Sequence, residues 1–241
     1  MPLPKIATPT YELDLPSTGK AIKYRPFLVK EEKILILALE SQDIKQITTA
    51  IKQVLKDCIL TKGIKIEELP TFDIEYIFLN VRGKSVGESI ELIVTCSDDE
   101  ETQVPVKVYI DEIQVQKDPN HSTEIKLDDN LILKMKYPSL NQFVKNNFDF
   151  SSNDVSSIDK SFDIVSSCID MVYNADECWA AADCTKKELT DWIETLTSNQ
   201  FQEIEKFFNT MPKLAHTFKV KNPKTEVESE VILEGLTSFF G

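Results

Sequence analysis

The sequence predicts an α+β fold, and two patterns carry that prediction. Between residues 44 and 60, apolar residues recur at three- and four-residue spacing, which is typical of one face of a helix. Between residues 90 and 110, apolar and polar residues alternate on either side of a polar turn, which indicates a β-hairpin. A second hairpin of this kind is expected at 216–233.

The chain of 241 residues is long enough for one large or two modest domains. We expect three consecutive regions. An N-terminal α/β region with a strand pair and three helices covers residues 1–87, a β-hairpin-rich middle covers 88–137, and a helical region that ends in a β-hairpin covers 138–241. The stretch 146–157 is rich in Asn, Asp and Ser and is the best candidate for a linker.

The N-terminal region begins with two short strands. Apolar residues alternate with polar ones at 11–15 and again at 22–24, with a turn between them. Residues 30–40 favour a short helix by composition. Ser41 is then expected to cap the amphipathic helix at 44–60.

The segment LPTFDIEYIFLNVRGKSVGE at residues 69–88 predicts a central helix. Thr71 is expected at its N-cap, with acidic residues in the first turn. Between Phe72 and Val81 almost no polar face remains, so we expect this helix to be buried. Gly83 or Gly87 is expected to end it, because glycine readily adopts a left-handed conformation.

Strands dominate the middle of the chain. The first hairpin turns at 97–101, and Pro105 favours an edge position because it has no N–H to donate. Residues 114–120 are interpreted as a connector. Further strands are expected at 124–127 and 131–137, with a tight turn between them.

Helices are expected to follow, up to Pro212. Pro138 starts a short helical piece, and apolar residues spaced by three and four predict a helix at 158–172. Two capping boxes, Thr185 with Glu188 and Thr197 with Gln200, mark the starts of two more helices.

The charge balance argues against nucleic-acid binding. The chain has 27 Lys and Arg against 40 Asp and Glu, a formal net charge of −13, and no basic run offsets it. The longest apolar run, Ile34–Leu39, is far shorter than the roughly 20 residues of a membrane helix. The N-terminus has no apolar signal segment and the five cysteines form no disulfide-scaffold pattern, so we expect synthesis in a reducing cytoplasm.

Two motifs that suggest chemistry have simpler interpretations. Gly83-Lys84-Ser85 matches the end of a phosphate-binding loop, but the full motif needs a glycine where Phe78 stands and a strand before the loop. The acidic turns at 98–101 and 128–129 lack the spaced ligands of a calcium loop and are expected to be solvated. Carboxylate-based hydrolysis at 98–101 is the enzymatic alternative.

No catalytic, cofactor-binding or metal site is predicted. His121 and His216 lie in no recognisable nucleophile setting. Cys178 and Cys184 are not spaced as zinc ligands, and no histidine is close to them in the sequence.

Aromatic residues near the C-terminus are the candidate partner contacts, namely Phe207, Phe208, Phe239 and Phe240. The terminal GLTSFFG lies beside the free carboxylate, where chains usually fray. It must therefore dock on the protein itself or form a contact surface for a partner. The sequence leaves both alternatives open.

Several segments resemble the baseplate hub subunits of T-even-type tailed phages. They are Thr10–Leu13 with Pro16–Lys20, the segment Tyr24–Lys33, the central segment at 69–88 and the C-terminal VILEGLTSFFG. Together they extend the resemblance over essentially the whole chain.

The resemblance implies a non-enzymatic protein of a contractile phage tail, made late in infection in the host cytoplasm. Such a protein is required for assembly of the central hub, either as a structural subunit in the virion or as an assembly chaperone. Its partners would be other baseplate hub and tail proteins, not nucleic acid or a membrane, and homo-oligomerisation is left open. The alternative is a generic cytoplasmic interaction module that binds one protein through its C-terminal helices and hairpin.

Some relatives of this kind carry cysteine pairs in two hairpin turns, as a zinc ribbon does. The corresponding turns here are TCSDDEET at 95–102 and VKNPKTEVES at 220–229, and they contain the single Cys96. No metal ligand is therefore carried over and no cofactor is expected. Packing alone is expected to hold the two hairpins.

Overall fold

The computed structural model describes residues 6–139, 142 and 155–235 and confirms the mixed α+β class. The chain divides into two compact units. Unit 1 consists of Met1–Ile66, Phe72–Gln116 and Lys213–Gly241, and unit 2 consists of Glu67–Thr71 and Lys117–Pro212. The C-terminal hairpin belongs to unit 1 with the N-terminal helices. The three consecutive regions expected from the sequence stay a prediction.

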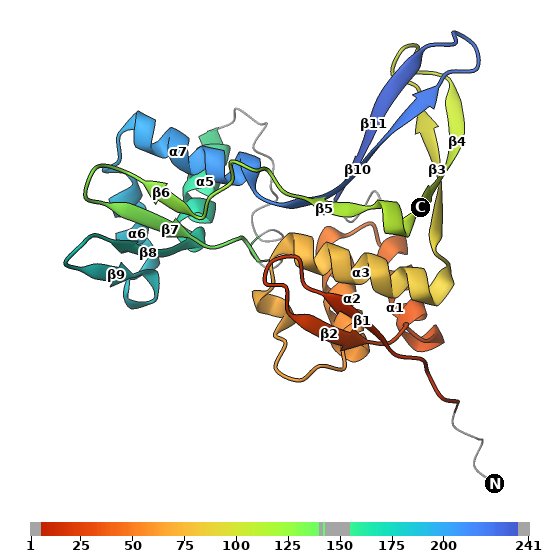
Figure 1. Cartoon of the computed structure of the whole chain (residues 1–241), viewed down its shortest axis with the longest axis horizontal. Coiled ribbons are helices and arrows are strands. Elements are labelled where there is room, and N and C mark those ends of the chain that lie inside the picture. Colours follow the sequence, from red (N-terminus) through yellow and green to blue (C-terminus); the bar gives the residue numbers. More distant parts are fainter. Residues whose placement is uncertain (1–5, 140–141, 143–154, 236–241) are drawn as a thin grey trace. The chain divides into compact units, whose positions relative to one another are not determined.

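Unit 1 contains the predicted strand pair and three helices (Figure 1). Strands β1 (Tyr11–Asp14) and β2 (Ala21–Tyr24) are antiparallel, and α1 (Val29–Glu40), α2 (Ile44–Cys58) and α3 (Thr71–Val86) follow, with a short 3-10 turn, η1 (Ile66–Glu68), before α3. Each of these elements supplies at least one side chain that is at most 8% exposed, including Leu13, Ile22, Leu35, Val54, Leu55, Ile66, Ile74, Ile77 and Phe78.

A tight turn folds α2 back against α1, and the residue that caps α2 differs from the predicted one. Asp43, not Ser41, is the N-cap of α2, because its Oδ1 accepts a hydrogen bond from the backbone N–H of Lys45 at 2.8 Å. Ser41 instead donates to the carbonyl of Ala38 at 2.6 Å. Gln42 between them adopts a positive φ of 52°, which reverses the chain within three residues.

Helix α3 is the buried central helix that the sequence predicts, and Gly87, one of the two glycines expected to end it, follows its last residue. The helix continues through Gly83 to Val86, and Gly87 has a φ of 133°. A Cβ at Gly83 would lie 3.0 Å from Cδ1 of Ile110. Gly83 therefore allows close packing of α3 against the base of the hairpins.

Two hairpins lie side by side in unit 1 (Figure 1). They are β3 (Ser89–Thr95) with β4 (Gln103–Tyr109) and β10 (Lys213–Lys221) with β11 (Glu228–Glu234), as predicted. The 3-10 turn η2 (Ile110–Glu112) and strand β5 (Gln114–Gln116) directly follow β4 in the sequence. The interpretation of 114–116 as a connector is wrong, because β5 pairs with β10 through Val115 and Leu214. A cluster at the base joins helix and hairpins: Leu79, Ile90, Val108, Ile110, Ile113 and Leu214.

Hydrogen bonds join the tips of the two hairpins, so the expectation of packing alone is wrong. The fully buried Asn222 donates from Nδ2 to both carboxylate oxygens of Asp98 at 3.0 Å, and Thr225 Oγ1 donates to the same carboxylate. Asp99 accepts from the backbone N–H of Thr102 at 2.9 Å. The first acidic turn is therefore a structural link as well as a surface loop.

Unit 2 is an antiparallel sheet covered by helices. The strand order is β6-β7-β8-β9, with β6 (Glu124–Lys126), β7 (Ile132–Met135), β8 (Ile169–Tyr173) and β9 (Cys178–Ala180). The helices are α5 (Val155–Cys168), α6 (Lys186–Ile193) and α7 (Ser198–Thr210), with the 3-10 turn η3 (Ala181–Asp183) before α6. Their shared core includes Leu133, Val165, Ile169, Val172, Ile193, Ile204 and Phe207.

One predicted helix of unit 2 is too long. The helix expected at 158–172 ends at Cys168, and Ile169–Tyr173 is strand β8 between β7 and β9. Both capping boxes are confirmed by their hydrogen bonds. The helical piece after Pro138 and most of the linker lie outside the described residues, but 155–157 belong to α5.

Candidate protein interface

Helix α1 leaves large apolar side chains exposed on its outer face. Val29, Ile36 and Leu37 are 79%, 49% and 56% exposed. With 3.6 residues per turn these three positions share one side of the helix, away from the buried Leu35. A contiguous exposed apolar surface on a protein is typical of an interaction site, so this face is a candidate interface.

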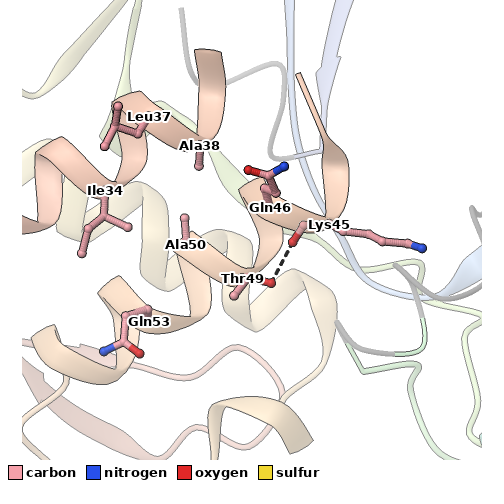
Figure 2. Close-up of a pocket in the computed structure, with 8 residues that line it drawn as sticks. All are labelled: Ile34, Leu37, Ala38, Lys45, Gln46, Thr49, Ala50 and Gln53. Atoms are coloured by element: carbon pink, nitrogen blue, oxygen red, sulfur yellow. Dashed lines mark hydrogen bonds between the residues drawn. The ribbon is translucent and has the colours of Figure 1, made fainter. Parts of the chain in front are cut away.

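A groove of about 550 Å³ lies between α1 and α2 beside this face (Figure 2). Ile34 and Leu37 of α1 form an apolar wall. Ala38 of α1 and Ala50 of α2 point toward one another between the two helices, and both are buried. Because their side chains are single methyl groups, they leave space above them that larger residues would fill.

The polar lining of the groove comes from α2, and its groups are mostly satisfied within that helix. Thr49 Oγ1 donates to the carbonyl of Lys45 at 2.8 Å. Gln46 and Gln53 donate from Nε2 to Asp43 and Asp57 at 3.2 and 3.1 Å.

Lys45 is the one lining residue with an ionisable side chain in the described groove, and its ammonium points away from the alanine pair (Figure 2). Apart from Lys45, the described lining residues are apolar or neutral, so the groove offers mainly apolar contact. It is suited to binding an apolar side chain or helix face and not to acid–base chemistry.

A buried ion pair holds the start of α1 in place. Arg25 Nη2 lies 3.0 Å from Oε1 of the fully buried Glu31, and Glu31 Oε2 accepts from the backbone N–H of Leu28 at 2.7 Å. Burial would raise the pKa of the Glu31 carboxyl, but hydrogen bonds from Arg25, Leu28 and Lys30 outweigh it and lower that pKa. The ionised pair fixes the first turn of α1 and thereby the outer face that carries Val29.

The predicted partner contacts Phe207 and Phe208 lie in the core of unit 2, where they are 2% and 7% exposed. The ring of Phe207 stacks on Tyr137, with centroids 5.7 Å apart, and meets Phe208 edge-on at 5.1 Å. The structure thus gives both rings an intramolecular packing role. Phe239 and Phe240 lie outside the described residues, and contact of the four with a partner stays a prediction.

The two histidines are held by structural contacts. His121 lies 3.0 Å from Thr210 Oγ1 through Nδ1 and 2.9 Å from Tyr137 Oη through Nε2. Burial lowers the pKa of His121, which favours the neutral ring in this hydrogen-bonded position. His216 stacks on Phe218 with centroids 5.6 Å apart.

The GKS sequence lies within α3 and not in a phosphate-binding loop. Lys84 pairs with Glu88. Ser85 Oγ donates to the carbonyl of Val81 at 2.6 Å and accepts from the backbone N–H of Phe27 at 2.9 Å. These side chains are occupied in joining α3 to neighbouring segments.

The cysteines form no metal cluster in the described part of the chain, where no group of three or more His, Cys, Asp and Glu is placed to hold a metal ion. Cys178 is exposed, and its thiol donates to the sulfur of Met171 at 3.8 Å. Burial raises the pKa of Cys58 to about 11 and that of Cys168 to about 12, which keeps both thiols protonated and unreactive.

Comparison with known proteins identifies the family. A family model described as T4 bacteriophage base plate protein matches residues 8–241, a range that includes parts of both units. No curated protein and no solved structure matches the chain. Among the described helices, none has the length and apolar character needed to cross a membrane. The chain belongs to the T4 bacteriophage base plate protein family, which implies a structural role in the phage baseplate and contacts with other baseplate proteins.

Proposed function

We propose that this chain is required for assembly of the central hub of the baseplate, and that the groove between α1 and α2 docks an amphipathic helix of another baseplate protein. The family match over residues 8–241 is the observation that carries the proposal. The exposed apolar face of α1 supports it, because a baseplate protein needs a surface for its neighbours. The chain acts either as a subunit of the virion or as an assembly chaperone, and both versions need this docking step.

The shape and chemistry of the groove favour a helix as its occupant. An amphipathic helix lays an apolar stripe into a groove of this kind and leaves its polar side in water. Fully burying a Val, Leu or Ile side chain is worth about 1.5–3 kcal/mol. Ile34 and Leu37, the two large apolar residues that line the groove, are 38% and 56% exposed, so covering them would contribute roughly 1 kcal/mol each, or about thirtyfold in affinity together.

The docking step is tested with Leu37→Asp in the full chain, expressed during infection by a phage that lacks the gene. The charge would sit in the proposed interface, so recovery of baseplate proteins on the tagged chain should fall about tenfold or more. Ile93→Asp on β3 is the matched control, because Ile93 is 71% exposed and lies outside the groove. Equal recovery with the two variants would refute the assignment of the groove, provided that circular dichroism shows both to be folded.

The role in assembly is tested separately on purified particles. Mass spectrometry that finds the chain in stoichiometric amount supports a virion subunit. Its absence from particles, together with its presence in hub intermediates, supports a chaperone. Normal tails after deletion of the gene would exclude both versions, and a pull-down that returned host proteins alone would favour a generic interaction module.

A further inference from the structure

Unit 2 carries an apolar pocket of about 400 Å³ that is separate from the groove in unit 1. Leu131, Val172 and Leu189 contribute aliphatic walls, and Trp179 and Trp192 contribute indole rings. A pocket of this size, lined mainly by apolar and aromatic side chains, is typical of a binding site.

The two tryptophans occupy different positions in this pocket. Trp192 of α6 packs against the core of unit 2, whereas Trp179 of the edge strand β9 is 45% exposed. Tryptophan is over-represented among the residues that dominate binding energy at protein interfaces. An occupant that filled only the pocket would leave the rim exposed, so the exposed indole favours an occupant with a larger surface, such as a protein segment.

Charge at the pocket selects among such segments. Glu188 is the one lining residue in the described chain that is charged at neutral pH. Its Oε2 accepts from the backbone N–H and the hydroxyl of Thr185 at 2.7 and 2.8 Å, and these bonds lower the pKa of the carboxyl. The lowered pKa keeps the carboxylate ionised at neutral pH. Among the described residues none donates to Oε1, so this oxygen can accept a further hydrogen bond from a cation.

We propose that this pocket docks a segment of another baseplate protein that inserts an aromatic or leucine side chain next to Trp179 and Trp192 and places a Lys or Arg beside Glu188. The inference goes beyond the proposed function, because it gives each unit a docking surface of its own. A single chain then holds two partner segments at once, as expected of a protein that joins parts of an assembly.

The test uses the intrinsic fluorescence of the full chain, which has only two tryptophans, both of them in this pocket. The probes are the synthetic peptides acetyl-Gly-Phe-Lys-Gly-amide and acetyl-Gly-Phe-Glu-Gly-amide. The Lys peptide should give a saturable change in emission with a Kd on the order of 1 mM. The Glu peptide should bind at least about threefold more weakly, since it meets the carboxylate of Glu188 with a like charge.

Three variants make the result specific. Glu188→Gln keeps the capping box, because Gln serves at that position as well as Glu, and it should abolish the difference between the two peptides. Trp179→Ala should weaken the Lys peptide about tenfold, with Trp192 still reporting. Leu37→Asp should leave the titration unchanged, so failure of this inference is distinguishable from failure of the proposed groove.

The inference is overturned by any of several outcomes. They are the absence of a response to either peptide, equal affinity for both peptides, and unchanged affinity in Trp179→Ala. Saturable binding of cyclohexanol without a response to the peptides would assign the pocket to a small apolar molecule and would also overturn it.

Discussion

Substitution of the buried Glu31 should strongly destabilise unit 1. The Glu31 side chain is 1% exposed and that of Arg25 is 15% exposed. The Glu31 carboxylate lies 3.0 Å from Nη2 of Arg25, 2.7 Å from the backbone N of Leu28 and 3.2 Å from Nζ of Lys30. Removing one partner of a buried pair costs about 3–5 kcal/mol, and Arg25 retains a hydrogen bond to the carbonyl of Pro26 at 2.9 Å. We therefore expect Glu31→Ala to cost about 3 kcal/mol, at the lower end of that range.

Glu31→Gln should cost less, about 1–3 kcal/mol, because the amide oxygen still accepts from Leu28 while the charge is lost. The free energy of unfolding is measured by urea denaturation and circular dichroism at 222 nm, which follows the helices of both units. Tryptophan fluorescence is recorded in parallel, because both tryptophans lie in unit 2. Glu31→Ala should move the dichroism midpoint by roughly 1–2 M urea.

Glu32→Gln is the matched control for Glu31→Gln. Glu32 also lies in the first turn of α1, so both variants remove one negative charge near the positive end of the helix dipole. Glu32→Gln should stay within about 0.5 kcal/mol of the wild type. If Glu31→Gln and Glu32→Gln had equal effects, the buried ion pair would contribute nothing beyond the helix dipole, and the reasoning would be refuted.

The pH dependence gives a second check on Glu31. Its pKa in the folded chain is lowered from the ordinary value of 4.5, so its contribution to stability is complete above 4.5 and is lost as the pH falls through the lower folded value. The difference in unfolding free energy between wild type and Glu31→Gln should therefore shrink as the pH falls below 4.5. A constant difference across that range would contradict the assignment.

Three further predictions concern other sites. Arg82→Met should raise the free energy of unfolding by about 1 kcal/mol, because Nη1 of Arg82 is buried without a hydrogen-bond partner among the described residues. A lower free energy of unfolding than that of the wild type, measured by urea denaturation, would contradict this. The exposed Cys178 should react with an aromatic disulfide reagent in the native protein, whereas Cys168 should react only on unfolding; equal rates would show that Cys168 is accessible. Asp98→Ala and Thr225→Val should each speed amide hydrogen exchange at both hairpin tips, and exchange that changed in one hairpin alone would show that the tips are not coupled.

Local signals in the sequence predicted the elements that depend on neighbouring residues. The capping boxes at Thr185 and Thr197 form as predicted, because each needs only residues within one helical turn. The hairpins also form as predicted, since alternation and a polar turn specify an antiparallel pair over a short stretch of chain.

Prediction failed where a distant partner decides the conformation. Ile169 and Val172 are three residues apart and fit a helical face, but β-branched side chains also fit a strand, and pairing with β7 and β9 settles the conformation. Val115 lies in a stretch that is too short to show a pattern, and it becomes a strand only because Leu214 lies beside it. The link from Asp98 to Asn222 joins residues 124 positions apart.

The α1 surface was missed for a related reason, although the sequence contained a signal for it. The run ILILAL is apolar on every side of a short helix, which is typical of a helix that is buried all round. The pattern does not tell whether the rest of the chain covers every side of the helix. The packed structure showed that Ile36 and Leu37 remain exposed.

By itself, the sequence determined the α+β class, a buried central helix within residues 69–88, the two hairpins and the resemblance to phage baseplate proteins, because these depend on periodicity, capping and recognisable segments. The tertiary structure decided which surfaces are available for binding. The groove needs α2 to fold back on α1, and the unit 2 pocket needs β9 and α6 to place Trp179 and Trp192 together. Exposure and the shape of a cavity arise only when elements pack, so no spacing within one segment specifies them.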